Sequence, residues 1–345
     1  MKKKLISILI TVTMLTMCAC GNSGGKSQDA SQSQPDSKVT ESESTKENAK
    51  DDAKEAESSA NSSTTATDPS GAEISIPEEV NSIVVLSPAL SEIITALDLG
   101  DKVVGYDSYS ADIEGLPDSE SITVFENITT PDMEQLTALN PDILLVTNET
   151  FYDQENPFQT LIDAGTCVIC VPNRDNIAGI KSDIEFLASA LGAAEAGAAL
   201  LEDFDTQLNE LADIAAKIPQ EERKRVYFEI APAPDMYSCG KDSYINEMLE
   251  WIGAENILAD QSGWFTVSGE TVVAANPDII FTNVNYTDDP VQEILNRDGW
   301  ADISAVSSKN VYSVDNNASS RPNHNIIKAM RQMAEILYPD YYTAE

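Results

Sequence analysis

The chain is poor in histidine, the side chain most used for acid–base catalysis and metal binding near neutral pH. It has a single histidine, His324, among 345 residues. A bare zinc or manganese site needs several histidines and carboxylates as ligands, so none is expected, and His324 is interpreted as polar loop surface rather than an axial haem ligand. The Gly240-Lys241 pair lacks the upstream glycine and the following Ser or Thr of a phosphate-binding loop. The sequence therefore predicts no catalytic residue, no metal site and no resident cofactor.

The cysteines include one pair with a spacing that can bind zinc or undergo redox chemistry, Cys167 and Cys170. The segment Cys167 to Val171 is apolar throughout, which is typical of a buried strand, and side chains three apart on a strand point to opposite faces. Both thiols are therefore predicted to be core residues. Cys239 is a lone thiol near a predicted loop and has no assigned role.

The N-terminus carries a targeting signal. Three lysines at positions 2 to 4 precede the apolar run Leu5 to Met17, which is too short to span a bilayer of about 30 Å, so residues 1–19 are predicted to be a signal peptide. Ala19-Cys20-Gly21 resembles a bacterial lipobox, in which a small residue precedes the acylated cysteine. Cys20 is thus predicted to be lipidated and to anchor the chain on the extracytoplasmic face of the cell membrane. The alternative is a cleaved secretory peptide with incidental cysteines.

Beyond the leader, the composition changes twice. Residues 20–71 are dominated by Ser, Thr, Lys, Glu, Asp, Asn and Gln, which predicts a disordered linker. Residues 72–345 are rich in Ile, Val, Leu and Ala, enough for two lobes of ordinary domain size. The formal net charge of -37 argues against a nucleic-acid partner, because binding phosphates requires clustered Lys and Arg.

An internal repeat indicates that the two lobes are equivalent. The pattern E-x-[LV]-x-A-x-N-P-D-I begins at Glu134 and again at Glu270. Each copy predicts a short helix, started by Thr130 before a proline or by Ser268, and ended by Asn-Pro. An apolar strand follows in each copy, over 143–146 and 279–281, as expected for an α/β sheet covered by helices.

A long helix is predicted between the lobes, over residues 193–217, with lobes over 72–192 and 218–345. Its length would be roughly 37 Å, enough to contact both lobes and to restrict closure to a small rocking motion. Gly100 and Gly253 are predicted to end helices in the left-handed conformation. The apolar stripe of the long helix consists of Leu200, Leu201, Phe204, Leu208, Leu211 and Ile214.

From Ile76 to Tyr341 the chain resembles the iron-chelate and vitamin B12 class of periplasmic-binding proteins of ABC importers. The segments that carry the resemblance are Leu86-Ser87-Pro88 with Glu92, Val104-Gly105-Tyr106, both Asn-Pro-Asp segments, Tyr237 to Tyr244, Gly253 to Ile257, and Arg321-Pro322. The resemblance implies an α/β fold of two Rossmann-like lobes joined by one long α-helix, with the ligand cleft between the lobes. It also implies a monomer that delivers a small-molecule metal chelate, such as a ferric siderophore, haem or cobalamin, to ABC permease and ATPase subunits.

The resemblance also implies specific site residues. Glu134 and Glu270 correspond to the carboxylates that dock on the permease, although each could simply favour a helix N-terminus. Aromatic side chains suit a flat chelate and one guanidinium suits a carboxylate, phosphate or catecholate oxygen. Trp251 and Trp300 are assigned to packing. The implied ligand contacts are Tyr109, Phe125, Tyr237, Trp264 and Arg321.

The ligand and two alternative functions stay open. Residues 315–325 have neither the aromatic nor the acidic residue at the places where the vitamin B12 pattern has them, which disfavours cobalamin, and a single assigned arginine is few for a ferric siderophore. The alternatives are a surface lipoprotein with a structural or adhesive role, and a cell-surface enzyme on the same fold.

Overall fold

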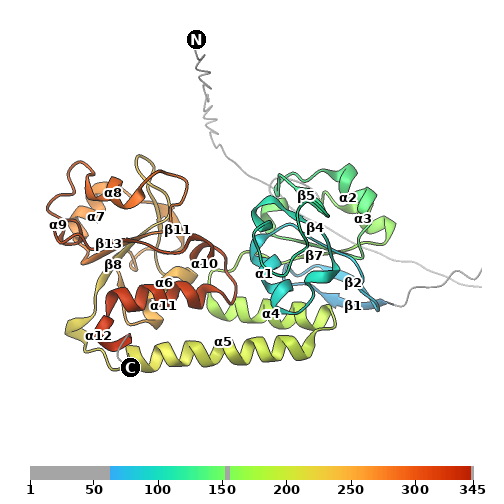
Figure 1. Cartoon of the computed structure of the whole chain (residues 1–345), viewed down its shortest axis with the longest axis horizontal. Coiled ribbons are helices and arrows are strands. Elements are labelled where there is room, and N and C mark those ends of the chain that lie inside the picture. Colours follow the sequence, from blue (N-terminus) through green and yellow to red (C-terminus); the bar gives the residue numbers. More distant parts are fainter. Residues whose placement is uncertain (1–62, 152–155, 343–345) are drawn as a thin grey trace, which may run out of the picture. The chain divides into compact units, whose positions relative to one another are not determined.

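The fold consists of two α/β lobes, each built on a parallel sheet (Figure 1). The computed structural model describes residues 63–151 and 156–342; the predicted signal peptide, Cys20 and most of the predicted linker lie outside them. The N lobe has strands in the order β5-β4-β3-β6-β7 and the C lobe has β10-β8-β12-β13, and every pairing within these sheets is parallel. The predicted fold class is confirmed. The sheet strands are β3 Ile83–Val85, β4 Val103–Asp107, β5 Thr123–Phe125, β6 Ile143–Val146, β7 Cys167–Cys170, β8 Arg225–Glu229, β10 Glu255–Asn256, β12 Ile279–Thr282 and β13 Val311–Ser313.

Helices cover both sheets, as parallel strands require crossover connections. No helix in the described part of the chain is long and apolar enough to cross a membrane. The α-helices are α1 Pro88–Ala96, α2 Met133–Leu139, α3 Gln159–Ala164, α4 Ile177–Ala190, α5 Ala194–Ala215, α6 Tyr244–Trp251, α7 Gly269–Ala275, α8 Pro290–Leu295, α9 Ser304–Ser307, α10 Asn316–Ser320, α11 Ile326–Leu337 and α12 Pro339–Tyr342, with short 3-10 turns at Gly100–Lys102, Ser108–Ser110, Asn148–Phe151 and Gln220–Glu222.

The predicted linker, residues 20–71, extends too far along the chain, because its last residues form a strand. β1 (Ser63–Thr67) pairs with β2 (Glu73–Pro77) in an antiparallel hairpin, although residues up to 71 were assigned to the linker. The carboxylate of Asp68 accepts hydrogen bonds from the amides of Ser70 and Ala72 in the turn and from the amide of Cys170 at the edge of the N-lobe sheet. Polar composition alone missed this strand because its stability comes from pairing rather than from apolar burial.

Both copies of the repeat fold alike. α2 and α7 each end at an asparagine in the left-handed conformation, Asn140 (φ 43°) and Asn276 (φ 47°). The carboxylate of the aspartate two residues later then accepts hydrogen bonds from backbone amides at or just before the start of the neighbouring strand. Asp142 accepts from the amides of residues 81 and 82 before β3, and Asp278 accepts from the amide of Arg225 in β8 at 2.9 Å. The repeat therefore encodes a helix, a turn and a bond to the adjacent strand.

The predicted starting residue is confirmed for α7 and is wrong for α2. Ser268 caps α7 through a bond from the amide of Thr271. In the other copy the cap is Asp132, which accepts from the amides of Glu134 and Gln135, rather than Thr130. Pro131 therefore precedes the cap and does not occupy the first helical turn.

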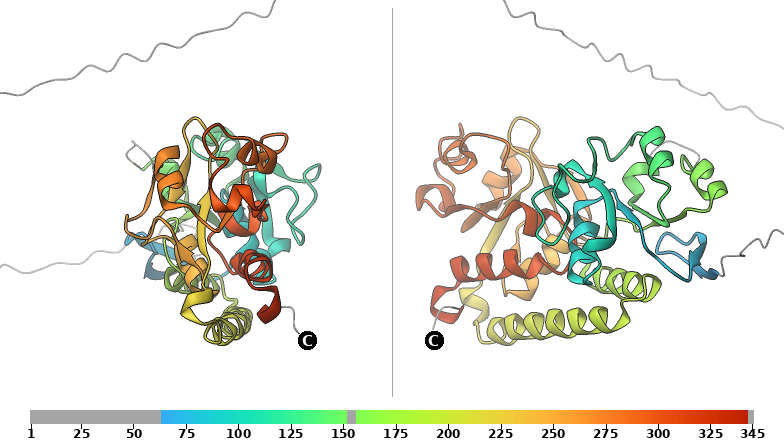
Figure 2. Two further views of the ribbon diagram at one scale, coloured as in Figure 1. Left: turned by 90° about the vertical axis from the view of Figure 1, so that its left-hand side faces the viewer. Right: turned by 45° about the vertical axis from the view of Figure 1, so that its right-hand side comes forward.

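The long helix predicted between the lobes is present as α5, of 22 residues and therefore roughly 33 Å long. It passes beneath both lobes and packs against α4 of the N lobe and against α6 and α11 of the C lobe (Figures 1 and 2). Its buried face includes Phe204, Leu208 and Leu211, whereas Leu200, Leu201 and Ile214 of the predicted stripe are half-buried.

The two predicted helix-ending glycines differ. Gly253 has the left-handed conformation, φ 84°, as predicted. Gly100 does not; Asp98 has the positive φ near the end of α1, at 58°. A side chain at Gly100 is excluded by close approach instead, because a Cβ there would lie 2.1 Å from the carbonyl oxygen of Gly115.

The cysteines and tryptophans are mostly core residues. Cys167 and Cys170 point to opposite faces of β7 and join different buried clusters, as predicted. Cys239 is buried in the short strand β9 (Tyr237–Cys239), and burial raises the pKa of each of the three thiols to about 11. Trp300 is buried and Trp251 is half-buried against the core, in keeping with their assignment to packing.

Candidate ligand-binding cleft

A cavity of about 450 Å³ lies where loops of both lobes meet. The N lobe lines it with the segments that follow β3, β6 and β7, at residues 87–89, 147–149 and 173–175. The carboxyl ends of parallel strands converge on one edge of a sheet, so loops from several strands can reach one ligand there. We call this the Trp264 cavity; its remaining lining residues are Ile128, Tyr244, Trp264, Ser320, Arg321 and Pro322.

A second, larger cavity of about 800 Å³ also takes residues from both lobes. We call it the Tyr109 cavity. Its N-lobe wall consists of α1 and of residues 108–115 after β4, and its C-lobe wall of residues 315–328 with Asn285 after β12. Arg321 lines this cavity as well as the Trp264 cavity, so the two form adjoining halves of one cleft.

Arg321 is held between the halves by a group of polar side chains, the Glu92 cluster, which consists of Glu92, Arg321, Asn323 and Asn325. Arg321 Nη1 lies 2.5 Å from Glu92 Oε1, and its Nη2 donates to the carbonyl oxygen of Tyr109 at 3.1 Å. The other carboxylate oxygen of Glu92 accepts from the amide nitrogens of Asn323 and Asn325, at 2.7 and 2.8 Å. The cluster therefore joins α1 of the N lobe to the segment before α11.

Trp264 is held by contacts to both lobes. It begins β11 (Trp264–Thr266), which pairs with β9. Its indole Nε1 donates to Asp175 of the N lobe at 2.8 Å, and its ring packs on Tyr244 with centroids 5.4 Å apart. The Tyr244 hydroxyl donates to the carbonyl oxygen of Ser319, and burial raises the pKa of this phenol. The orientation of the Trp264 ring is thus set by contacts within the protein.

Of the five residues implied as ligand contacts, three line the cleft, and Tyr237 and Phe125 do not. Trp264 and Arg321 line the cleft, and Tyr109 lines it with a side chain that is 65% exposed. Tyr237 is half-buried in β9, opposite Thr266, and is not among the described residues that line either cavity.

Phe125 is a correction to the predicted site. Its side chain is 2% exposed and belongs to a buried cluster of the N lobe with Val84, Leu86 and Leu144. It ends β5, and a Cβ at Gly105 on the neighbouring strand would lie only 3.0 Å from its ring. Phe125 therefore packs beneath the sheet edge and has no surface to offer a ligand.

Glu134 and Glu270 are both exposed, in the first turns of α2 and α7. These helices lie in the part of each lobe that is remote from α5 (Figure 1). Neither carboxylate has an ion-pair partner among the residues that the structure describes. The two carboxylates are therefore free to face an external surface.

His324 is not the exposed residue that was expected. It is partly buried beside the Tyr109 cavity, and its Nδ1 has no hydrogen-bond partner within residues 63–151 and 156–342. Burial lowers the pKa of the imidazole, so it is neutral at physiological pH. In the same described ranges, no group of three or more His, Cys, Asp or Glu side chains could hold a metal ion.

Several residues that line the cleft are not among the predicted ligand contacts: Glu92, Asp175 and Tyr244. The segments with Glu92 and Tyr244 carry part of the resemblance, whereas no motif marks Asp175. Contacts across the lobes, such as Trp264 to Asp175, leave no signal in the sequence.

Comparison with known proteins identifies the family. Residues 83–318 match the model of the family described as periplasmic binding protein. The chain is 33% identical over 281 residues to the ABC transporter substrate-binding lipoprotein YvrC of Bacillus subtilis, covering 81% of this chain and 86% of that one. It is 27% identical to the molybdate-binding protein MolA of Haemophilus influenzae, over 71% of this chain and 76% of that protein.

Two further likenesses agree with this match. The solved structure of MolA bound to molybdate has a TM-score of 0.68 at 25% identity and covers 81% of this chain and 93% of that one. A vitamin B12-binding protein of Vibrio campbellii is 24% identical, over 73% of this chain and 88% of that protein. The chain therefore belongs to the periplasmic binding protein family, the extracytoplasmic substrate-binding components that work with the permease and ATPase of ABC transporters.

Proposed function

We propose that this chain is a lipid-anchored substrate-binding protein that captures a metal chelate in the cleft between its lobes and delivers it to the permease of an ABC importer. The observation that carries the proposal is the cleft itself, which collects loops from the carboxyl ends of both sheets and aromatic side chains from both lobes. The anchor is assigned to Cys20, on the lipobox-like sequence and the likeness to a substrate-binding lipoprotein. The chain itself is proposed to carry out no catalytic step.

The size and walls of the cleft favour a chelate over a bare oxyanion. The two halves have volumes of about 450 and 800 Å³, within the range of sites that enclose drug-sized molecules. Trp264 and Tyr109 supply flat apolar area, which suits an organic ligand more than a small hydrated ion. The relatives that bind molybdate and vitamin B12 show that the family accommodates both kinds of ligand.

Docking on the permease is assigned to Glu134 and Glu270. Their equivalence in the repeat, their exposure and their positions in the first turns of α2 and α7 support this role. An exposed ion pair is worth only about 0 to 1 kcal/mol, so a single contact would not hold the complex. Two contacts, one from each lobe, raise the effective concentration of the second once the first has formed.

The proposal is tested by a thermal-shift panel on the chain without its first 20 residues. The ligands are ferric siderophores, haem, cobalamin and molybdate. A ligand at 100 times its Kd stabilises a protein by about 2.7 kcal/mol, which raises the melting temperature visibly. We expect at least one metal chelate to do so and molybdate to have no effect. Stabilisation by molybdate alone would contradict the chelate assignment.

A further inference from the structure

We propose that the cleft selects chelates that are neutral or positively charged, and that Glu92 sets this preference by neutralising Arg321. The inference rests on the proposed function and assigns the class of chelate. It also changes the role expected for Arg321, which the sequence had suggested as the group that binds an anionic oxygen of the ligand.

The geometry of the Glu92 cluster leaves Arg321 little capacity for an anion. The guanidinium has a carboxylate at 2.5 Å on one nitrogen and the carbonyl oxygen of Tyr109 at 3.1 Å on another. The side chains of Arg321 and Glu92 are only 12% and 11% exposed. A ligand anion would therefore have to displace a carboxylate that is also bonded to Asn323 and Asn325.

The remaining basic residues of the cleft do not supply the positive charge that an anionic ligand would need. Arg174 forms a two-bond ion pair with Asp183, at 2.5 and 2.7 Å, so its charge is also neutralised within the protein. Lys328 is exposed at the rim and, among the described residues, has no carboxylate within ion-pair distance. His324 adds no charge at neutral pH because burial lowers its pKa. The rim lysine is thus the one cleft cation of the described chain that is not already neutralised.

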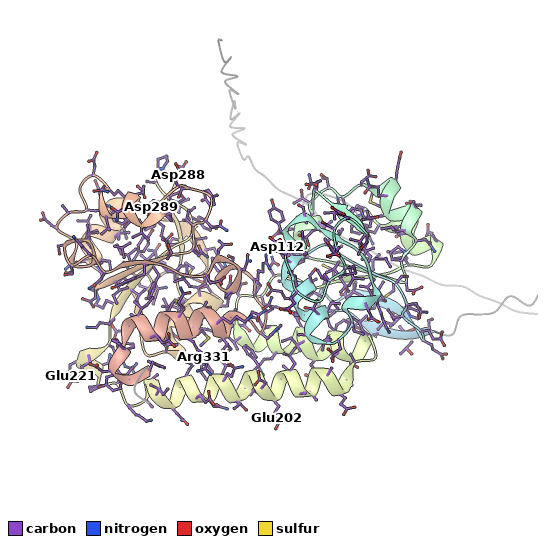
Figure 3. All side chains as sticks on the ribbon, viewed as in Figure 1. Asp112, Glu202, Glu221, Asp288, Asp289 and Arg331 are labelled. Atoms are coloured by element: carbon purple, nitrogen blue, oxygen red, sulfur yellow. The ribbon has the colours of Figure 1, made fainter. Side chains whose placement is uncertain are left out.

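Carboxylates that have no ion-pair partner among the described residues lie on both sides of the Glu92 cluster. Asp112, Glu114 and Asp315 line the Tyr109 cavity, and Glu149 and Asp175 line the Trp264 cavity. Asp112 lies on the edge of the N lobe that faces the C lobe (Figure 3). An anion that leaves water to enter this cleft meets like charges that outnumber the one unneutralised cation, Lys328, whereas a neutral or cationic ligand meets no such repulsion.

A purely structural role for Glu92, as a bond between the lobes, makes a different prediction. Glu92→Gln keeps the size of the side chain and an oxygen that can accept hydrogen bonds, but it leaves the Arg321 charge unpaired. If Glu92 only joins the lobes, the substitution weakens binding of all chelates alike. If Glu92 sets the charge preference, the substitution improves the binding of anions selectively.

The test compares three chelates that share iron(III) but differ in charge: cationic ferrioxamine B, neutral ferrichrome and trianionic ferric enterobactin. Affinities are measured by calorimetry on the full chain, on Glu92→Gln and on Glu114→Gln. Glu114 lines the same cavity and has no ion-pair partner in the described chain, so its variant removes the same charge without releasing an arginine. The melting temperature of each variant verifies that it is folded.

We expect the unaltered chain to bind the trianion at least about tenfold more weakly than the better of the other two chelates, and Glu92→Gln to reduce this gap by about tenfold. Glu114→Gln should leave the gap nearly unchanged. Adding Arg321→Gln to Glu92→Gln should restore the gap, because the released charge is then gone.

The outcomes separate the inference from the proposed function. Tightest binding of the trianion by the unaltered chain would overturn the inference and leave the chelate-binding function in place. An equal gain in Glu114→Gln and Glu92→Gln would overturn the role of Glu92, since total charge would explain it. Absence of binding of all three chelates to every variant would overturn the inference, and it would overturn the proposed function as well if haem and cobalamin also fail to stabilise the protein in the thermal-shift panel.

Discussion

Phe125 and Tyr109 are both aromatic residues of the N lobe, but they contribute to the protein in different ways. The Phe125 ring is enclosed by the buried cluster beneath β5, while most of the Tyr109 ring is in contact with solvent at the cleft. Removing a buried aromatic ring costs transfer free energy and leaves a cavity. Removing an exposed ring costs little stability but deprives a ligand of contact area.

We therefore predict that Phe125→Ala lowers the free energy of unfolding by about 3 to 5 kcal/mol, and that Tyr109→Ala changes it by less than about 0.5 kcal/mol. Urea unfolding followed by fluorescence measures both. The effect on ligand affinity should be the reverse, with a loss in Tyr109→Ala only. A stable Phe125→Ala protein with weakened ligand binding would contradict this prediction and show that Phe125 contacts the ligand.

The burial of Phe125 and the exposure of Tyr109 could not be distinguished from the sequence. Thr123 to Phe125 forms a strand of three residues, too short to show an alternating pattern, so its inward face could not be recognised. The Arg321–Glu92 pair joins residues 229 positions apart, and no periodicity relates them. Arg321 lines both cavities, but its partner, and hence its neutralised charge, depends on the packing of the two lobes.

The long helix α5 depends on one small residue for its contact with α4. Gly197 is buried in α5, and a Cβ there would lie 2.2 Å from the Cβ of Ala188 in α4. Glycine inside a helix is unfavourable by about 1 kcal/mol relative to alanine, so propensity alone would favour a larger residue. The close approach of the two helices explains why glycine occupies the position.

We predict that Gly197→Ala destabilises the protein by about 1 to 2 kcal/mol despite its better helix propensity, because overpacking costs about 1 to 3 kcal/mol. Ala199→Gly, at an exposed position of the same helix, measures the propensity effect alone and should cost about 1 kcal/mol. Chemical unfolding of both variants gives the comparison. A rise in stability of Gly197→Ala would show that the helices can separate at no cost.

Elements with strong local signals were predicted well. The two repeat helices follow from a polar start and an Asn-Pro end, and α5 follows from apolar residues three and four apart. β1 was missed because its threonines and serines are equally typical of a linker. The start of α2 differs from the prediction by two residues, because Asp132 rather than Thr130 caps it.

The two carboxylates proposed to dock on the permease, Glu134 and Glu270, belong to different lobes, so the proposed delivery involves the whole molecule. We predict that the double change Glu134→Lys and Glu270→Lys abolishes uptake of the ligand in cells while its affinity for the purified protein stays within about twofold. Uptake of radiolabelled iron or cobalt chelate measures transport, and calorimetry measures binding. Each single change should reduce uptake less than the pair.

The matched control reverses two exposed carboxylates of α5, Glu202→Lys and Asp213→Lys. They make the same change in net charge, and Glu202 points away from the lobes (Figure 3). Uptake should be normal in this control. If it fails there as well, the total charge of the protein, rather than the two docking positions, governs delivery.

The passage of the chain from one sheet to the other through α5 has a consequence for biogenesis. Every described strand of the N-lobe sheet precedes α5 and every described strand of the C-lobe sheet follows it, so neither sheet waits for a strand from the other half. As the polypeptide emerges from a membrane channel, the first half can complete its sheet while the second is still being threaded. Vectorial export and stepwise maturation are therefore compatible.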